Sequence, residues 1–571
     1  MIARHQRECM QRFIERLVAV CLTSALGQLA LVPNASADAR SAGQGNPLDS
    51  LPKLEPTPAP TVTVDIQPQV QDPAMQRLLA SRIVPSRFQI AGVESIPFEL
   101  VAAEFAPMTN RQVTVAELLQ AANKVTQIYQ ERGYPLSFAF VPAQSFKDNV
   151  VVVNVVEGYV STVKIAGNPG ASEDRLRSIA EQLKEDRPLS RDTFDRITGI
   201  LSLQPGMRIK ATVRPPENTD GASEMTLDVS RKPLTTSFAV DTATSNLRGI
   251  FSVTENGLTP LGEQITVSTI APRGPSREEY VGLNYVQPIR WQGMLLQVTM
   301  SDYKGEPENQ GLVAQQLQAR YQTKTQRVSA ALSYPLILKP SRNLTLSGGI
   351  YAVKNSARYT LDVAAPAPSI ELSSDIRALS LELVSSEVSD RSSTQWSLGV
   401  YQGFDSLGAR QINGNIDLDF FRIKGSFTHS RQFDGGYGIA LSGMGQYSNS
   451  ILPLSEQVGF GAKLYGLAYP VGEIAGDKGW GVSLEFNRAF PYDGSYVKRI
   501  QPYVLADAAK VYVNAGRLTH SEISSVGTGV RFSDLRHYSL DLSIAQPVGE
   551  IPINANKRSP RLNLAYSYQL D

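Results

Sequence analysis

From residue 234 to its last residue, the chain alternates apolar and polar side chains with a period of two. The pattern is clear in Tyr538–Ile544 (YSLDLSI) and in Leu562–Leu570 (LNLAYSYQL). Successive side chains of a β-strand point to opposite faces, so each such run predicts a strand with one apolar and one polar face. We count about 17 candidate strands, which fit either a soluble β-sandwich or a transmembrane antiparallel β-barrel. The period alone does not separate these two fold classes.

Aromatic residues and the N-terminal segment favour the transmembrane barrel. Nineteen of the 22 tyrosines and all three tryptophans lie beyond residue 234, and both residue types concentrate at membrane interfaces. Residues 1–37 are typical of a secretory signal peptide, with four arginines, an apolar stretch and an A-x-A cleavage site at Ala35–Ala37. No later segment offers roughly 18 consecutive apolar residues, so an exported chain would cross a membrane only as a barrel.

Composition argues against several other classes of protein. The net charge is +1, from 55 basic and 54 acidic residues, which disfavours nucleic-acid binding. Both cysteines, Cys9 and Cys21, lie within the predicted signal peptide, so the mature chain would have no disulfide, thiol nucleophile or cysteine metal site. The four histidines are scattered without metal-ligand spacing. We therefore expect no metal, no cofactor and no enzymatic activity.

A linker and two similar units precede the strand-rich region. Residues 38–85 form the proline-rich linker, in which Met75–Ile83 has a helical pattern. Residues 86–158 and 159–232 each predict the order β-α-α-β-β, and we expect the second strand of each unit to pair with the first and third. The expected elements of the first unit are strands at 88–90, 136–141 and 150–156, a helix at 97–105 and a longer helix that begins at a capping box of Thr114 and Glu117; those of the second are strands at 160–166, 208–214 and 224–230 and helices at 172–183 and 191–203.

Three motifs connect these regions to a known family. They are Arg132-Gly133-Tyr134 with Val155-Val156-Glu157-Gly158 in the first unit, the run 472–480 (GEIAGDKGW), and Gln501-Pro502-Tyr503 with Asp507. With them, residues from about 73 to 571 resemble the outer-membrane transporters of two-partner secretion. These form the TpsB family of haemolysin and haemagglutinin secretion proteins (ShlB/FhaC/HecB-like), within the Omp85 superfamily.

The resemblance implies a complete architecture. It implies a transmembrane antiparallel β-barrel of about 16 strands at 234–571, preceded by two small α/β POTRA domains at 86–158 and 159–232. It also implies a short helix in the linker that plugs the pore. A long sixth extracellular loop, about 451–480, would fold back into the lumen. The barrel would lie in the bacterial outer membrane and the POTRA domains in the periplasm.

The tip of this loop departs from the family pattern. The family reads V-R-G-Y where this chain has Leu464, Tyr465, Gly466 and Leu467. The family arginine pairs with an aspartate of the barrel wall, which Asp507 matches. Here either Lys463 would replace the arginine or Tyr465 would donate a neutral hydrogen bond. A charge-assisted hydrogen bond is about twice as strong as a neutral one, so we expect a looser loop.

Several other candidate residues have two interpretations each. Arg531 lies on a probable strand and either faces Asp507 or is a generic arginine of the lumen. Glu473 and Asp477 belong to the loop motif, but solvated loop charges would look the same. Gly466 is either a tip residue with a role in the family or a plain turn glycine. The remaining members of the loop motif are Gly472, Gly476 and Trp480.

The resemblance also implies a function. The protein would bind a large secreted exoprotein (a TpsA-like adhesin or haemolysin) through its POTRA domains and secrete it unfolded through the pore. It would act as a monomer among outer-membrane lipids, without nucleic acid. The alternatives are an assembly factor for other outer-membrane proteins and a porin-like channel. A channel would work without residues 86–232, whereas a secretion pore would not.

Overall fold

The computed structural model describes residues 81–144, 149–214, 216, 219–243, 247–271, 278–289, 292–306, 319–361, 368–463 and 465–570, with Leu48, Leu51 and Leu79. The predicted signal peptide and most of the predicted linker lie outside these residues, as does Leu464 of the loop tip. Across the described ranges, no helix is both long enough and apolar enough to span a membrane.

The first unit is a three-stranded sheet covered by two helices. Its elements are β1 (Arg82–Ile83), β2 (Arg87–Ala91), α3 (Phe98–Phe105), η2 (Ala106–Met108), β3 (Val113–Thr114), α4 (Val115–Glu131), β4 (Phe138–Phe140) and β5 (Val150–Val156). The third strand, β5, lies in the centre, parallel to β2 and antiparallel to β4. The expectation of a central second strand was wrong, because β4 pairs only with β5 and the first strand, β2, pairs with the other side of β5. This parallel pairing is possible because the helices between β2 and β4 form a crossover connection. The helical pattern expected to reach Ile83 was also wrong at its end, because Arg82 and Ile83 form a strand that pairs with β3.

The longest helix of this unit begins where the sequence predicts. Thr114 and Glu117 form the capping box: the backbone N–H of Glu117 donates to the Thr114 hydroxyl, and the Glu117 carboxylate accepts from the Thr114 backbone N–H. The capping box satisfies N–H groups that the first helical turn leaves without partners. The buried face of α4, with Leu118 and Val125, then packs with Val153 of β5 in one core.

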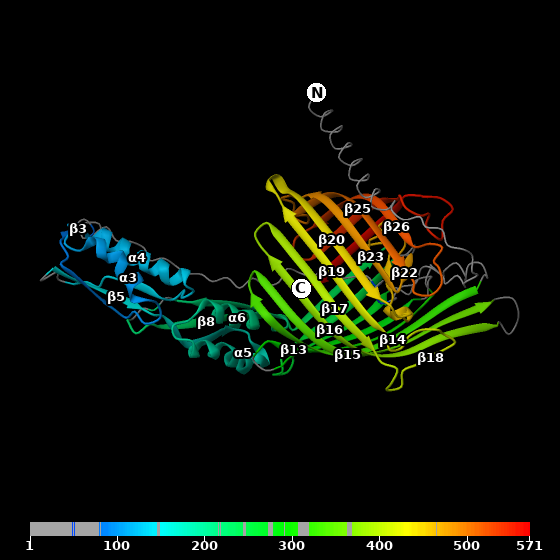
Figure 1. The fold of residues 1–571 in the computed structure, drawn as a ribbon, viewed down its shortest axis with the longest axis horizontal. Coiled ribbons are helices and arrows are strands. Elements are labelled where there is room, and N and C mark those ends of the chain that lie inside the picture. Colours follow the sequence, from blue (N-terminus) through cyan, green and yellow to red (C-terminus); the bar gives the residue numbers. More distant parts are fainter. Residues whose placement is uncertain are drawn as a thin grey trace, which may run out of the picture. The chain divides into compact units, whose positions relative to one another are not determined.

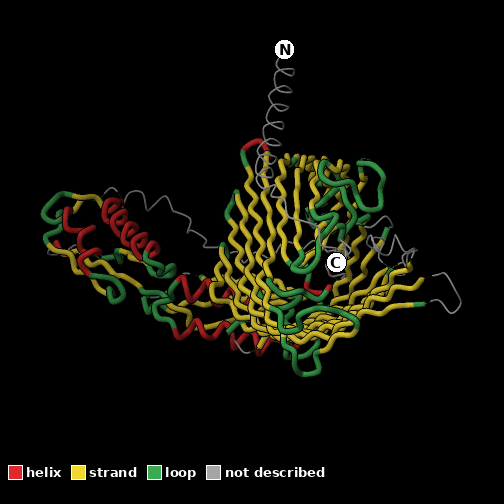
Figure 2. Tube along the Cα trace, turned by 45° about the vertical axis from the view of Figure 1, so that its right-hand side comes forward, coloured by secondary structure: helices red, strands yellow, loops and turns green. Residues whose placement is uncertain are grey.

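The second unit repeats this arrangement. Its elements are β6 (Tyr159–Gly167), η4 (Gly170–Ser172), α5 (Glu173–Ala180), η5 (Glu181–Glu185), α6 (Arg191–Ser202), β7 (Met207–Val213) and β8 (Ala222–Arg231). The third strand is again central, with β8 parallel to β6 and antiparallel to β7. The expected helix at 172–183 is divided, since its last turn is 3-10 rather than α. Among the described residues, the long helices drawn in red in Figure 2 belong to these two units.

Among the described residues, sixteen long antiparallel strands close a single barrel (Figure 1). The barrel confirms the predicted fold class. Its strands are β9 (Leu234–Asp241), β10 (Arg248–Asn256), β11 (Gln264–Ala271), β12 (Glu279–Ile289), β13 (Met294–Gly305), β14 (Ala319–Lys339), β15 (Arg342–Leu361), β16 (Ser369–Val388), β17 (Ser392–Gly403), β19 (Phe421–Gln432), β20 (Tyr437–Ser448), β23 (Lys478–Arg488), β25 (Arg499–Tyr512), β26 (Glu522–Ser533), β27 (Tyr538–Pro547) and β28 (Arg561–Leu570), with short additions at β18 (Arg410–Ile412), η6 (Asp434–Gly436) and β24 (Phe490–Pro491).

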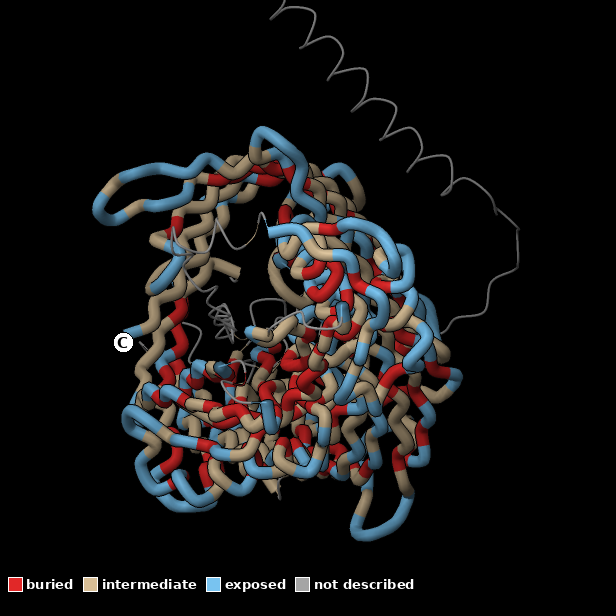
Figure 3. The backbone as a smooth tube through the Cα atoms, turned by 90° about the vertical axis from the view of Figure 1, so that its left-hand side faces the viewer, coloured by how far each residue is buried: buried red, intermediate tan, exposed pale blue. Residues whose placement is uncertain are grey.

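The two faces of the barrel wall differ as in a membrane protein. On β12 and β13, Leu283 pairs with Met300, and both apolar side chains are exposed. The next pair, Asn284 and Thr299, points to the opposite face, where Thr299 and Gln297 donate hydrogen bonds to Asn284. Exposed apolar side chains outside and hydrogen-bonded polar side chains inside are typical of transmembrane barrels. Figure 3 shows further exposed residues on the loops at the barrel rim.

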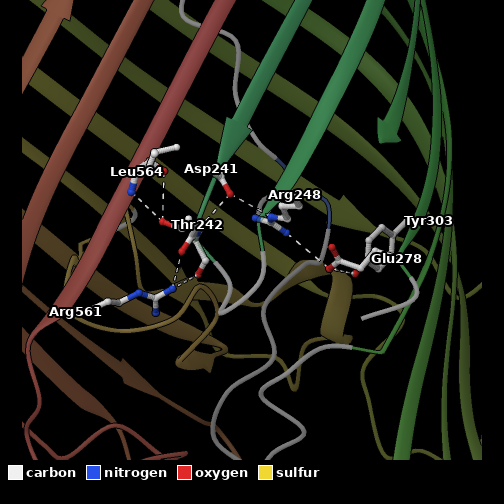
Figure 4. Close-up of polar contacts among 8 residues, drawn as sticks. Asp241, Thr242, Arg248, Glu278, Tyr303, Arg561 and Leu564 are labelled. Carbon is white, nitrogen blue, oxygen red and sulfur yellow. Dashed lines mark hydrogen bonds and ion pairs between the residues drawn. The ribbon is translucent and has the colours of Figure 1, made fainter. Parts of the chain in front are cut away.

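The barrel closes where its first strand meets its last. β28 pairs with β9 from Ala565–Asp241 to Leu570–Thr236. Beyond this ladder, the backbone N–H of Thr242 donates to the Leu564 carbonyl, and the Arg561 guanidinium donates to the Thr242 carbonyl (Figure 4). This seam therefore combines a short ladder with side-chain contacts at its rim.

Candidate functional site

Residues 449–477 form a long loop that folds back on itself between β20 and β23. It contains η7 (Leu454–Glu456), β21 (Val458–Phe460) and β22 (Ile474–Gly476), and the two short strands pair antiparallel. The loop ends at residue 477, three residues before the predicted end at 480, because Lys478 already begins β23. In Figure 1, β20, β23, β25 and β26 lie side by side in the wall that this loop faces.

The loop packs on the inner face of that wall. Phe460 and Ile474 of the loop share a buried apolar cluster with Ala509 and Val511 of β25. The alternate residues of β25, such as Val504, are exposed on the outer face. Since side chains alternate along a strand, Ala509 and Val511 point into the barrel, and so the loop occupies part of the lumen.

Asp507 holds the loop tip through backbone groups. Its carboxylate is buried and accepts from the backbone N–H of Leu467 at 2.9 Å. It also accepts from the backbone N–H and the hydroxyl of Ser525 on β26. The Ser525 hydroxyl in turn accepts from the Ala468 backbone N–H at 3.3 Å. In the described part of the chain, the hydrogen bonds to Asp507 thus come from neutral donors.

The residues expected to replace the family arginine lie elsewhere. Lys463 is exposed, and its side chain has no described contact with Asp507. Tyr465 has a positive φ of 57°. Its ring lies against the wall at Gly481, so close that a Cβ added to Gly481 would stand 2.7 Å from the Tyr465 ring. Its ring meets Phe460 edge-on, with centroids 6.0 Å apart. The tyrosine therefore contributes packing where the family arginine would contribute charge.

The structure also places the three other candidates at this wall, Arg531, Gly466 and Trp480. Arg531 binds the Glu485 carboxylate with both terminal nitrogens, at 2.8 and 2.6 Å, and does not reach Asp507 among its described contacts. A Cβ on Gly466 would stand 2.6 Å from the Ile523 side chain, so the glycine permits close packing of the tip. Trp480 is 43% exposed on β23 and belongs to the outer face, away from the loop.

The acidic residues of the loop motif are fully buried. Asp477 accepts from the backbone N–H groups of Leu452 at 2.8 Å and Asn514 at 2.7 Å. Glu473 accepts from the Ile553 backbone N–H at 2.6 Å. Neither carboxylate is a solvated loop charge, since both have 0% exposure. They join the loop to itself and to two neighbouring connections between barrel strands, 513–521 and 548–560.

The two glycines of the motif have backbone roles. Gly472 has a positive φ of 69°, a conformation that favours glycine. At Gly476 an added Cβ would stand 2.5 Å from the carbonyl oxygen of Tyr512. Gly476 therefore lets the loop approach the wall more closely than a residue with a side chain would, and Gly472 serves a backbone conformation that favours glycine.

A buried ion pair between Glu456 and Arg422 was missed by the sequence analysis. Glu456 lies in the loop, Arg422 on β19, and their charged groups are 2.7 Å apart. The Tyr351 hydroxyl donates to the same carboxylate at 2.9 Å, and Arg422 also donates to Gln446 at 3.1 Å. A lone glutamate within the mostly apolar run 451–460 (ILPLSEQVGF) was the available signal. Its partner stands about thirty residues earlier in the sequence, so spacing could not identify it.

His520 makes a second charged contact that the sequence did not reveal. Its Nε2 is 3.3 Å from a Glu473 oxygen, and its Nδ1 is 2.7 Å from a Glu550 oxygen. Burial alone would lower the pKa of this imidazole, but the two carboxylates outweigh burial and raise the pKa to about 9. The histidine is therefore positively charged at neutral pH.

The loop also contacts both sides of the barrel seam. The Val471 backbone N–H donates to the Ala243 carbonyl beyond β9 at 3.1 Å. The Asn563 side chain on β28 donates to the Leu467 carbonyl at 3.1 Å. Close to the seam, Arg248 lies 3.2 Å from Asp241 and 3.7 Å from Glu278, which accepts from Tyr303 (Figure 4).

In the first unit, the motif glutamate Glu157 is a structural anchor. Its carboxylate accepts from the backbone N–H groups of Glu94 and Ser95 at 3.0 and 2.8 Å and from the Tyr129 hydroxyl at 2.8 Å. Partial burial would raise the pKa of Glu157, but these hydrogen bonds prevail and lower it. At Gly158, a Cβ would stand 2.5 Å from the Leu136 carbonyl oxygen. The motif thus fixes the connection between the helices and the central strand.

The site holds the loop in the lumen through non-covalent contacts. Within the described ranges, no three histidine, cysteine, aspartate or glutamate residues are grouped so as to hold a metal ion. The buried carboxylates of the loop are occupied by hydrogen bonds and ion pairs that join it to the wall and to neighbouring loops. These contacts can break and form again without any covalent step.

Comparisons with known proteins agree with this architecture. The sequence model of the ShlB-type POTRA domain matches residues 83–158, and that of haemolysin secretion/activation protein ShlB/FhaC/HecB matches residues 251–532. Heme/hemopexin transporter protein HuxB of Haemophilus influenzae (strain 86-028NP) is 19% identical over an alignment of 494 positions that covers 82% of this chain and 85% of HuxB.

Two solved structures share the fold. CdiB from Escherichia coli has a TM-score of 0.62 and 18% identity, over 88% of this chain and 93% of CdiB. BamA from Haemophilus ducreyi lacking POTRA domains 1–3 has a TM-score of 0.55 and 15% identity, over 86% of this chain and all of that one (100%). The two matching sequence models together cover more than half of the chain. The chain therefore belongs to the ShlB/FhaC/HecB family of haemolysin secretion/activation proteins, the TpsB-type transporters of the Omp85 superfamily.

Proposed function

We propose that this outer-membrane transporter recognises a large exoprotein in the periplasm and secretes it unfolded through the barrel. The family and its POTRA domain imply a secreted TpsA-like partner. The observation that carries the proposal is the loop 449–477, which occupies the lumen through hydrogen bonds and two buried ion pairs. A chain in transit needs the lumen free, and non-covalent contacts allow the loop to leave and return.

The small sheets of the first and second units support the recognition step. In each sheet, the two outer strands pair on one side only among the described residues: β2 and β4 in the first, β6 and β7 in the second. An extended segment of the exoprotein can add a strand to such an edge by backbone hydrogen bonds, which tolerate many sequences. Apolar pockets beside the edge would then supply specificity. Folding of the exoprotein outside the cell would give the transport its direction without a cofactor.

The BamA-like fold favours an assembly factor as the second candidate function. An assembly factor would insert other barrels into the membrane rather than pass a chain through its lumen. A porin-like channel is less favoured, because the loop fills part of the lumen that such a channel keeps open.

The exoproteome separates these functions. Proteins released by cells that have or lack the chain would be compared by mass spectrometry, with a third strain producing the chain without residues 86–232. Secretion predicts loss of one very large exoprotein, restored by the full chain alone. An unchanged exoproteome with an altered set of outer-membrane barrels would favour the assembly factor. If the chain without residues 86–232 restores all of the secreted proteins, recognition by the two units is contradicted.

A further inference from the structure

Three extracellular connections meet at one buried histidine. His520 belongs to 513–521, Glu473 to the lumen loop 449–477, and Glu550 to 548–560. Each nitrogen of the His520 ring faces a carboxylate oxygen. Nδ1 lies 2.7 Å from Glu550, and Nε2 lies 3.3 Å from Glu473 in a charge contact without an aligned hydrogen bond. Two carboxylates on opposite sides of the ring favour the imidazolium cation between them.

Burial strengthens the attraction between His520 and Glu473 once the histidine is protonated. Glu473 is fully buried and His520 is 7% exposed, so the two charges interact where water screens them weakly. Two cations lie on the side of Glu550: Lys510 of β25, which pairs with Glu522 of β26 at 2.9 Å and also interacts with Glu550, and Arg558, which donates to the Gly549 carbonyl at 2.7 Å. The Ser521 backbone N–H also donates to Glu550.

We propose that His520 is a positioning residue that holds the lumen loop closed, as the cation of a clasp formed with Glu473 and Glu550. The proposal rests on the proposed function, in which this loop blocks the pore until secretion begins. The tip has lost the family's charged contact, since Tyr465 stands in place of the arginine and Asp507 binds neutral donors. The clasp supplies a charged contact near the other end of the loop, where the chain returns to β23.

The clasp has a defined pH dependence. The imidazole pKa rises from 6.5 to about 9 in the folded state. A raised pKa means that the contribution of the clasp is fully present below pH 6.5 and is lost as the pH rises through about 9. The difference between the two pKa values corresponds to an opening equilibrium that changes by at most about 300-fold over this range. Carboxylate, lysine and arginine side chains ordinarily titrate outside pH 6.5–9.5.

Channel recordings of the full chain in planar lipid bilayers would test the clasp between pH 6.5 and 9.5. We expect wild-type open probability to be low at neutral pH and to rise steeply towards pH 9. The variant His520→Gln should be open far more often at neutral pH, with a flat pH profile. Glu550→Gln should shift the wild-type midpoint to lower pH, because one carboxylate no longer favours the imidazolium.

His537→Gln is the matched control. His537 also contacts a carboxylate, with its Nδ1 2.8 Å from Asp534, but this pair lies in the connection between β26 and β27, away from the loop. Its variant should keep the wild-type profile. Heat-modifiable migration in gels would show that each barrel is folded, and Glu550→Gln serves if His520→Gln does not fold.

A flat wild-type profile, or a Glu550→Gln midpoint that stays at the wild-type value, would overturn the clasp. The exoproteome comparison tests the secretion function independently of the channel recordings. If residues 86–232 are needed for secretion while His520→Gln stays closed at neutral pH, the clasp is wrong and the proposed function stands. If the pH profile is as expected but no exoprotein depends on the chain, the clasp stands as a gate and the secretion function is wrong.

Discussion

Replacing Arg422 by methionine should release the lumen loop. The substitution keeps an apolar stem of similar length over the Tyr401 ring, which the guanidinium now covers at 4.0 Å. It removes the cation 2.7 Å from Glu456, a residue with almost no exposed surface. The Glu456 carboxylate would then stay buried with one strong partner fewer, or leave the lumen with its loop and become hydrated.

The size of the effect follows from the burial of this pair. Removing one partner of a buried ion pair costs about 3–5 kcal/mol, because the other charge is left without compensation. The barrel keeps its strand ladders, so the cost falls on the closed position of the loop. Each 1.4 kcal/mol is a tenfold change in an equilibrium constant. We therefore expect the open fraction of the loop to rise by about 100- to 4,000-fold.

Cysteine labelling would measure this release. The only cysteines of the chain, Cys9 and Cys21, lie in the predicted signal peptide, so Ser455→Cys would provide a single reporter beside Glu456. Ser455 is 5% exposed in the closed loop, and the labelling rate with a membrane-impermeant maleimide would report its opening. Arg410→Met is the control, because Arg410 pairs with Asp375 at 2.8 Å with its side chain 64% exposed, and exposed ion pairs contribute about 0–1 kcal/mol.

Equal labelling rates for Arg422→Met and Arg410→Met would refute the reasoning. The double variant Arg422→Met/Glu456→Gln gives a second check. It leaves no unpaired charge and should label more slowly than the single variant.

Three other substitutions test the tip and the first unit. Asp507→Ala should raise labelling of an Ala468→Cys reporter by about 5- to 150-fold, because the buried N–H of Leu467 loses its acceptor at a cost of about 1–3 kcal/mol; a rate equal to that of wild type would mean that Asp507 does not hold the tip. Gly481→Ala should raise channel conductance by pushing Tyr465 from the wall, whereas Gly445→Ala, with only one atom 3.9 Å from an added Cβ, should not. Glu157→Gln should speed amide hydrogen exchange at Ser95 in the full chain, with a weakening of roughly 1.5–3 kcal/mol per lost hydrogen bond to the charged group. Because the pKa of Glu157 is lowered, its contribution is present above 4.5 and fades as the pH falls further, so the variant and wild type should converge in acid.

The fold was largely predictable because its signals are local. Alternation with a period of two identified the barrel strands, and the Thr114–Glu117 capping box marked the start of α4. The order of strands within the small sheets was not predictable in the same way. Each unit joins its first strand to its third, and this pairing depends on how the helices pack rather than on any residue of the strands.

The candidate site was less predictable because its contacts are long-range. Resemblance placed Asp507 and the loop motif, but it assigned Asp507 a charged partner that this sequence lacks. Arg422, Ser525 and His520 come from three separate parts of the wall and rim, and none stands in a motif. The burial of Glu473 and Asp477 also depends on neighbouring loops, so a carboxylate in a glycine-rich run cannot be told from a solvated one by sequence.

The distribution of charge along the loop has a mechanical consequence. The tip is held by backbone N–H groups that donate to the Asp507 carboxylate and the Ser525 hydroxyl, and by packing of Tyr465. The ion pairs lie nearer the two ends, at Glu456 after β20 and at Glu473 before β23. Breaking a buried ion pair costs about 3–5 kcal/mol, whereas leaving a buried N–H without its acceptor costs about 1–3 kcal/mol. We therefore expect the tip to detach before either end. A chain pressing on the tip then needs to break only the weaker contacts at first, and the ends still anchor the loop for its return.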